Sequence, residues 1–234
     1  MTDVLVIAVA QPSVTSFDVT ANVAAHAAAV RSAGARVVVF PEMSLTGYEF
    51  AAEPVAPDDP RLAPLVAACA ETGAVALAGA PVGGDPRFIG VLAVDGGGAR
   101  VAYRKQYLGA AEAAHFVPGR EPAVLEVDGW RLGLAICKDT GEPQHAADTV
   151  ALGIDVYVAG VLEGAADAHV QPGRVGRITA DHRVPVALAS FAGSTGEGFD
   201  AAAGGSGVWA ADGTLLDGAG TEPGAVVRVT LRRG

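Results

Sequence analysis

Two uninterrupted apolar runs near the start of the chain, residues 4–10 and 37–40, constrain the fold more than any other feature. Both are rich in β-branched residues. Such runs are typical of strands covered on both faces, because a strand with one wet face alternates apolar and polar residues. Between them, apolar residues recur at spacings of four, four and three from Asp18, a residue able to cap a helix, to Gly34, a residue able to end one. The pattern predicts a strand, a helix and a second strand.

The rest of the chain alternates helical patterns with short strands. A second helix is predicted from Asp59-Pro60 to Gly73. Hairpins joined by glycine-rich or Asp-Gly turns are predicted for 74–80, 88–94 and 99–104, then 124–127 and 131–136. Beyond them the pattern predicts a helix over 143–153, a strand over 154–159, a helix over 173–183, a strand over 185–190, and a closing hairpin of 207–210 with 226–231. Buried strands with helices on either side of a hairpin region predict a four-layer α-β-β-α sandwich.

Composition favours one soluble domain over residues 1–234. Half of the chain is apolar and 18% is charged, which is enough for a core and too little charge for disorder. No linker rich in proline or serine divides it. The net charge of −10 disfavours nucleic acid as a partner. No apolar run is long enough to span a membrane, and the first ten residues lack a cationic start, so we expect a cytoplasmic protein.

Three reactive side chains follow predicted strands. Glu42 comes just after Phe40-Pro41, Lys105 after Tyr103-Arg104, and Cys137 after 131–136. Reactive groups collect at the carboxyl ends of strands in open α/β architectures. A carboxylate, an ammonium and a thiol that met there would supply a base, an electrostatic stabiliser and a nucleophile, which are the parts needed for acyl transfer at a C–N bond. The two cysteines, Cys69 and Cys137, show no metal-binding spacing, so we expect no metal.

These segments resemble the signatures of the nitrilase superfamily, the carbon–nitrogen hydrolases. Residues 38–48 resemble the first signature, 103–119 the lysine segment with a second glutamate at Glu112, and 133–139 the nucleophile segment. Residues 177–192 and 205–213 resemble the closing elements. The resemblance covers nearly the whole chain in the right order. It implies the four-layer sandwich of that family, no cofactor, and a homodimer or higher homo-oligomer.

The resemblance also implies a mechanism. Glu42 would take the proton of Cys137, whose thiolate attacks the substrate carbon. Lys105 and the backbone N–H of Lys138 would stabilise the oxyanion, and Glu112 would orient Lys105 or the substrate. Water activated by Glu42 would then hydrolyse the thioester.

Several residues admit another interpretation. Lys138 stands where the family commonly has an aromatic residue, so its side chain could bind substrate or could point away and lend only its N–H. His145 offers a papain-like Cys–His pair as an alternative. Cys69 lies on the apolar face of a predicted helix, which favours a core position. The glycine-rich segment 193–198 is expected to form a surface or pocket-rim loop.

The expected function is a hydrolase of a non-peptide C–N bond in a small molecule, with an amide as the preferred substrate. The alternatives on the same scaffold are an N-carbamoyl hydrolase, a nitrilase, and an acyl transferase that passes the acyl group to an amine. A non-catalytic metabolite-binding protein is the alternative from another class, although it would have no need of Glu42, Lys105 and Cys137 together. A glutamine-amidotransferase-type site fits less well, because Ile136 and Lys138 are bulky neighbours for its nucleophile.

Overall fold

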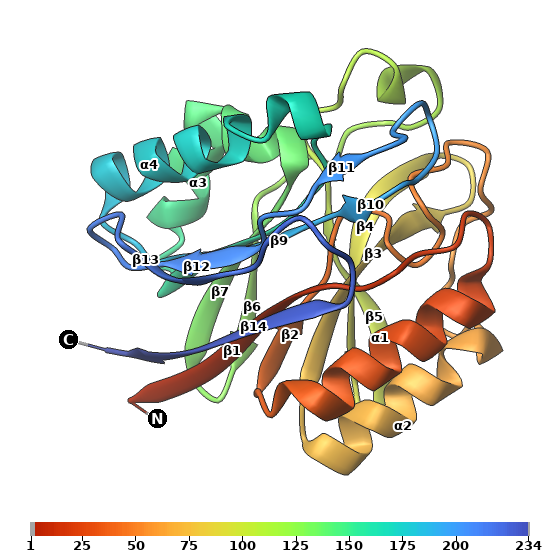
Figure 1. The fold of residues 1–234 in the computed structure, drawn as a ribbon, viewed down its shortest axis with the longest axis horizontal. Coiled ribbons are helices and arrows are strands. Elements are labelled where there is room, and N and C mark those ends of the chain that lie inside the picture. Colours follow the sequence, from red (N-terminus) through yellow and green to blue (C-terminus); the bar gives the residue numbers. More distant parts are fainter. Residues whose placement is uncertain (1–2, 234) are drawn as a thin grey trace.

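Two six-stranded sheets pack face to face in the computed structural model, which describes residues 3–233. The strand order is β14-β1-β2-β3-β4-β5 in the first sheet and β13-β12-β9-β8-β7-β6 in the second. Helices α1 and α2 lie on one outer side of the molecule, and α3 and α4 lie on the other (Figure 1). The predicted four-layer α-β-β-α sandwich is therefore confirmed.

The first sheet and its helices come mainly from the first half of the chain. The strands are β1 (Val4–Gln11), β2 (Val37–Val39), β3 (Val75–Gly83), β4 (Arg87–Asp95), β5 (Gly98–Arg104) and β14 (Ala225–Arg232). The helices are α1 (Val19–Ala33) and α2 (Ala63–Thr72), the latter preceded by the short 3-10 turn η1 (Pro60–Leu62).

The second sheet comes from the second half. Its strands are β6 (Ala123–Val127), β7 (Trp130–Ile136), β8 (Val156–Val161), β9 (Val186–Ser190), β12 (Gly207–Trp209) and β13 (Leu215–Gly218). Its helices are α3 (Pro143–Ala151) and α4 (Val170–His182). Short elements complete the chain: 3-10 turns η2 (Glu112–Ala114), η3 (Cys137–Gly141) and η4 (Ala165–Asp167), and strands β10 (Ala192–Gly193) and β11 (Ala202–Ala203).

Local sequence explains the helix ends. The Asp18 carboxylate accepts the N–H of Ala21 at 2.9 Å and so caps α1, while Gly34 ends α1 with a left-handed φ of 55°. Asp59 accepts the N–H of Arg61 at 2.9 Å ahead of η1 and α2. The predicted limits of the first helix are thus confirmed. The second ends before Gly73 as predicted, but its opening residues 60–62 form a 3-10 turn, and the α-helix begins at Ala63. Within residues 3–233, no helix is both long and apolar enough to cross a membrane.

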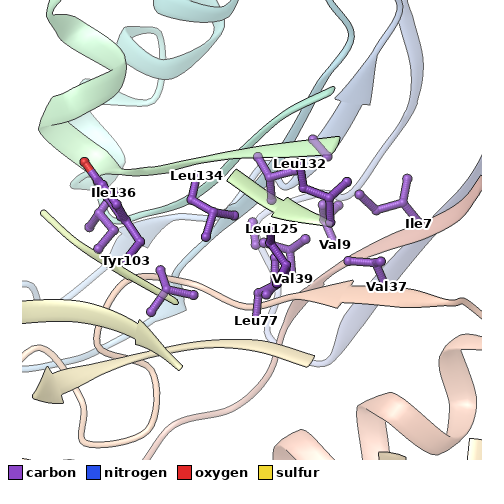
Figure 2. Close-up of a cluster of buried hydrophobic side chains, with 14 of the residues drawn as sticks. Ile7, Val9, Val37, Val39, Leu77, Tyr103, Leu125, Leu132, Leu134 and Ile136 are labelled. Carbon is purple, nitrogen blue, oxygen red and sulfur yellow. The ribbon is translucent and has the colours of Figure 1, made fainter. Parts of the chain in front are cut away.

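The main core lies between the two sheets. Figure 2 shows Val9, Val39 and Leu77 from the first sheet against Leu132 and Leu134 from the second. Separate apolar clusters lie under α1 and α2 and under the helices of the second sheet. Strands buried on both faces leave polar groups only where strands end, and this is where the candidate site forms.

The closing segment differs from expectation. β12 pairs with β13, but residues 225–232 do not return to that hairpin. Instead β14 runs antiparallel to β1, from Val4 opposite Arg232 to Gln11 opposite Ala225 (Figure 1). The prediction that 226–231 completes the hairpin is wrong. β14 instead covers the open side of β1, whose backbone groups would otherwise lack partners.

His26 gives the fold a pH-dependent contribution to stability. It is buried in α1, where Nδ1 donates to the carbonyl of Asn22 at 2.7 Å, Nε2 accepts from Ser44 Oγ at 2.8 Å, and the ring lies 4.1 Å from that of Phe40. Burial lowers the pKa of His26 to about 4 from its usual 6.5. The folded state therefore binds fewer protons than the unfolded state between these values, and stability falls as pH falls through this window.

We expect the free energy of unfolding contributed by His26 to drop by about 2 kcal/mol between pH 7 and pH 4.5. Denaturant titrations of the wild type and of His26→Gln at both pH values measure it, since the difference between the two proteins removes the other titrating groups. An equal pH dependence in the two proteins would contradict the assignment.

Candidate active site

Glu42 lies in a tight turn between the two sheets, just beyond β2. Two strand glycines, Gly79 of β3 and Gly160 of β8, make room for this turn. A Cβ on Gly79 would lie 2.4 Å from the Met43 nitrogen and 2.4 Å from the Pro41 oxygen, and one on Gly160 would lie 2.5 Å from the Phe40 oxygen. Neither glycine was anticipated from the sequence. The available signal was a glycine inside a buried apolar strand, which often marks the close approach of another backbone.

Lys105 is enclosed between two carboxylates. Its Nζ lies 2.6 Å from Glu42 Oε1 and 2.6 Å from Glu112 Oε1, and the Lys105 side chain is 1% exposed. Glu112 also accepts the Tyr48 hydroxyl at 2.6 Å and the Gly109 N–H at 2.6 Å. By contrast, Glu42 Oε2 is buried and takes no hydrogen bond from residues 3–233. The sequence-predicted Glu42, Lys105 and Glu112 thus come together, with one carboxylate oxygen unpaired.

The three groups of this cluster differ in how readily they ionise. Burial, the largest influence, raises the pKa of Glu42 well above its ordinary range against the opposing effect of Lys105. Burial also opposes the charge of Lys105, but the carboxylates of Glu42 and Glu112, and Cys137 when it is a thiolate, outweigh burial and raise the pKa of Lys105. Glu112 is buried too, yet Lys105 and the donors around Glu112 keep the pKa of this carboxyl low. Lys105 and Glu112 therefore stay charged, while Glu42 binds a proton readily.

Cys137 begins η3 directly after β7, with a left-handed φ of 40°. A non-glycine residue adopts this region at an energetic cost, and such strain is common at functional sites. The thiol donates to the Leu162 carbonyl at 3.2 Å. Burial and Glu42 raise the pKa of the Cys137 thiol, and Lys105 partly counters them. The resting group is a thiol that needs a base before it can act as a nucleophile.

Asp139 fixes the turn that carries Cys137. Its buried carboxylate accepts the N–H of Ile136 at 3.0 Å, the N–H of Tyr107 at 2.9 Å and the Tyr103 hydroxyl at 2.8 Å. These bonds tie η3 to the end of β7 and to the segment after Lys105. The two halves of the site are thereby held together.

The remaining candidates lie elsewhere. His145 Nε2 is 2.9 Å from the Tyr103 hydroxyl, and its Nδ1 is 2.9 Å from the Tyr157 hydroxyl, with no hydrogen bond to Cys137 in the described chain. The Lys138 side chain donates to the Leu108 carbonyl at 2.8 Å. Cys69 is buried in α2. The structure therefore does not bring His145 into a Cys–His pair.

The loop expected at the pocket rim packs against the segment after Glu42. Thr195 Oγ1 accepts the N–H of Tyr48 at 2.8 Å, and Glu197 Oε1 accepts the N–H of Phe50 at 3.0 Å. The Phe199 ring meets Tyr48 edge-on at 5.5 Å. Tyr48 is thus held by this loop and by Glu112, and its contact with Glu112 was not anticipated from the sequence.

The sequence of this chain resembles those of known hydrolases. The family model for carbon–nitrogen hydrolases matches residues 6–234. The chain is 31% identical to a hydrolase of Pseudomonas protegens over 144 residues, which are 57% of this chain and 50% of that protein. The chain thus spans about half the length of the curated relatives it matches.

Solved structures show the same fold. Nit3 of Saccharomyces cerevisiae, a member of branch 10 of the nitrilase superfamily, aligns with a TM-score of 0.88 at 19% identity, covering 99% of this chain and 91% of that one. An amidase from Nesterenkonia sp. AN1 aligns with a TM-score of 0.82 at 26% identity, covering 96% and 92%. Variants of that amidase hold butyramide, or carry the acetamide moiety of fluoroacetamide covalently on the active-site cysteine.

Proposed function

The chain belongs to the carbon–nitrogen hydrolase family, and we propose that it hydrolyses a small-molecule amide through a covalent intermediate on Cys137. The observation that carries this proposal is the buried Glu42–Lys105–Glu112 cluster beside the thiol. Stability alone does not explain such a cluster, because the attraction within a buried ion pair rarely offsets the free energy needed to remove its charges from water. A base, a cation and a nucleophile in one buried place are what acyl transfer requires.

In the first step, Glu42 takes the thiol proton of Cys137 and the sulfur attacks the amide carbon. The pair of electrons of the C=O π bond moves to the oxygen. Lys105 has three ammonium protons, and two point to carboxylates, so the third is available to this oxyanion together with the N–H of Lys138. Each such contact contributes about 3–4 kcal/mol to transition-state stabilisation.

In the second step, the C–N bond breaks and Glu42 returns its proton to the leaving nitrogen, which departs as ammonia or an amine. A thioester remains on Cys137. Water then gives a proton to Glu42 and attacks the thioester carbon. The C–S bond breaks to release the acid, and Glu42 returns the proton to the Cys137 sulfur, which restores the thiol and the carboxylate. The unpaired Oε2 of Glu42 supports this role, because a buried carboxylate oxygen without a protein donor is free to meet a water or a substrate N–H.

An amide is the proposed substrate class, ahead of an N-carbamoyl compound or a nitrile. The likeness to an amidase at 26% identity supports this choice, as does the amide-derived adduct on the cysteine of that amidase. We also propose that water, rather than an amine, accepts the acyl group. The protein is further proposed to be a homodimer and to be cytoplasmic.

Intact-protein mass spectrometry tests the proposal. The protein is mixed briefly with pools of small amides, carbamoyl compounds and nitriles, quenched in acid, and compared with Cys137→Ala. We expect a mass increment from an amide pool in the wild type only, together with released ammonia. An increment that persists in Cys137→Ala would place the chemistry elsewhere. No increment and no ammonia from any pool would favour the metabolite-binding alternative.

A further inference from the structure

A third carboxylate, Glu163, lies beside Cys137 and takes no part in the proposed chemistry. It follows Leu162, whose carbonyl accepts the Cys137 thiol at 3.2 Å, and its side chain is 19% exposed. Glu42 comes from the end of β2 in the first sheet, whereas Glu163 comes from the end of β8 in the second. Glu163 therefore follows the strand next to β7, which carries Cys137, and its charge acts on the thiol from the second sheet.

Neighbours hold the Glu163 carboxylate by one oxygen only. Gln171 Nε2 donates to Oε1 at 2.9 Å, and Arg174 Nη1 donates to the same oxygen at 3.1 Å. No donor from residues 3–233 meets Oε2. Thr140 Oγ1 lies 3.0 Å from Gln171 Oε1 and 2.6 Å from the Cys137 carbonyl, so the same network reaches the nucleophile turn. The result is an oriented carboxylate with a free oxygen.

The Glu163 carboxylate is unfavourable for forming the Cys137 thiolate. Its negative charge raises the pKa of the Cys137 thiol and so opposes formation of the thiolate. Burial raises the pKa of Glu163 itself, which shows that ionising it here is costly, although Arg174 and Gln171 act in the other direction. A bound cation would relieve both effects, because it would pair with Glu163 and cancel its field at the sulfur.

We propose that Glu163 is a specificity-determining residue that selects substrates whose acyl group carries an ammonium. The inference rests on the proposed function, since it names the substrate class of the same site. The scissile nitrogen must face Glu42, which returns the proton, so the group that meets Glu163 belongs to the acyl part. Arg174 orients the carboxylate from α4 and leaves Oε2 to the ligand.

The first test does not need turnover. Three methanethiosulfonates of similar size, with aminoethyl, hydroxyethyl and sulfonatoethyl groups, react with Cys137. The cysteine sulfur forms a disulfide with the reagent, and methanesulfinate leaves with the electron pair. Rates from intact mass are divided by the rates of each reagent with a free thiol, and Cys137→Ala reports any reaction at Cys69.

We expect Glu163→Gln to lower the ratio of aminoethyl to hydroxyethyl rates about tenfold, the effect of one partly screened charge at short range. Glu142→Gln, which removes a carboxylate next to the same turn, is expected to leave the ratio unchanged. Gln can still accept from Gln171, so the thermal midpoint of Glu163→Gln is expected to stay near that of the wild type. A ratio that Glu163→Gln leaves unaltered, or a wild type that prefers the sulfonatoethyl reagent, would overturn the inference.

The second test uses turnover. Amides with a terminal ammonium, from 3-aminopropanamide to 5-aminopentanamide, are compared with the uncharged amides in which a methyl replaces the ammonium. We expect the wild type to have the higher kcat/KM for the charged member of at least one pair, and Glu163→Gln to reverse that preference. Turnover of the uncharged amides with no charge preference would overturn the inference and leave the proposed function standing. A changed thiol ratio with no turnover of any amide and no adduct would support Glu163 as a cation site and contradict the amide hydrolase.

Discussion

Lys105→Met is expected to lose at least a hundredfold in turnover and to make stability depend strongly on pH. The ammonium of Lys105 lies 2.6 Å from both Glu42 and Glu112, and all three side chains are buried. Without it, two carboxylates share a dry site with no cation between them. Removing one partner of a buried ion pair costs about 3–5 kcal/mol when the other charge stays, and a group that stabilises an oxyanion contributes a factor of about 10² to 10³ in rate.

The sign of the pH dependence follows from the pKa values of the carboxylates. In Lys105→Met, burial and mutual repulsion raise the pKa of at least one of them in the folded state above its unfolded value. The variant is therefore close to full stability at pH values below the ordinary glutamate pKa of about 4.3, and it loses stability as pH rises toward the raised value. Denaturant titrations at pH 4.5 and pH 8 measure the difference from the wild type, which we expect to be larger at pH 8.

Two further variants separate the effects. Lys105→Met with Glu112→Gln removes one carboxylate, so stability at pH 8 is expected to recover in part while turnover stays lost. Lys138→Met removes a partly exposed cation near the same turn, and its stability is expected to stay within about 0.5 kcal/mol of the wild type. A loss of stability in Lys105→Met that is equal at both pH values would argue against the buried charges as its cause.

The layered fold could be predicted because its signals are local. Continuous apolar runs and capping residues such as Asp18 and Gly34 act within a few positions along the chain. The pairing of β14 with β1 could not be predicted in the same way. Residues 225–232 carry a partly buried strand pattern that suits either sheet, and their partner lies more than two hundred residues away in sequence. Only the closure of the whole sandwich decides between the two.

Some residues of the candidate site could likewise be predicted from local sequence, and others could not. Glu42, Lys105 and Cys137 could be anticipated because each follows a strand, where the architecture brings side chains together. Tyr48 could not, because its contacts depend on how loops close over the strand ends. Glu163 also follows a strand, β8, but the predicted strand ended at residue 159 and left Glu163 four residues beyond it. Glu163 in particular stands in a segment of small residues, where no periodic pattern distinguishes it from a solvated surface carboxylate.

Gly160→Ala and Gly79→Ala are expected to lower turnover about a hundredfold, with a smaller loss of stability. A Cβ on Gly160 would lie 2.5 Å from the Phe40 oxygen and 3.1 Å from the Glu42 nitrogen, and one on Gly79 would lie 2.4 Å from the Pro41 oxygen. These partners are backbone atoms, so the chain itself must move. Extra volume in a packed interior costs about 1–3 kcal/mol, whereas a displacement of about 1 Å in a reacting group can cost a hundredfold in rate.

We expect the added Cβ to displace the turn at Glu42 rather than the strands β3 and β8. β3 and β8 are fixed by neighbours on both edges, while the turn at Glu42 includes Met43 with a left-handed φ of 51°. Gly176→Ala is the matched control, because a Cβ at that position of α4 meets nothing within 4 Å. It is expected to raise stability by about 1 kcal/mol, as alanine does in a helix interior, with unchanged turnover. Unfolding free energies and turnover of the three variants separate the cases. If Gly160→Ala loses stability but keeps full turnover, β8 shifts instead of the turn. The position of Glu42 would then not depend on the absence of a side chain at Gly160.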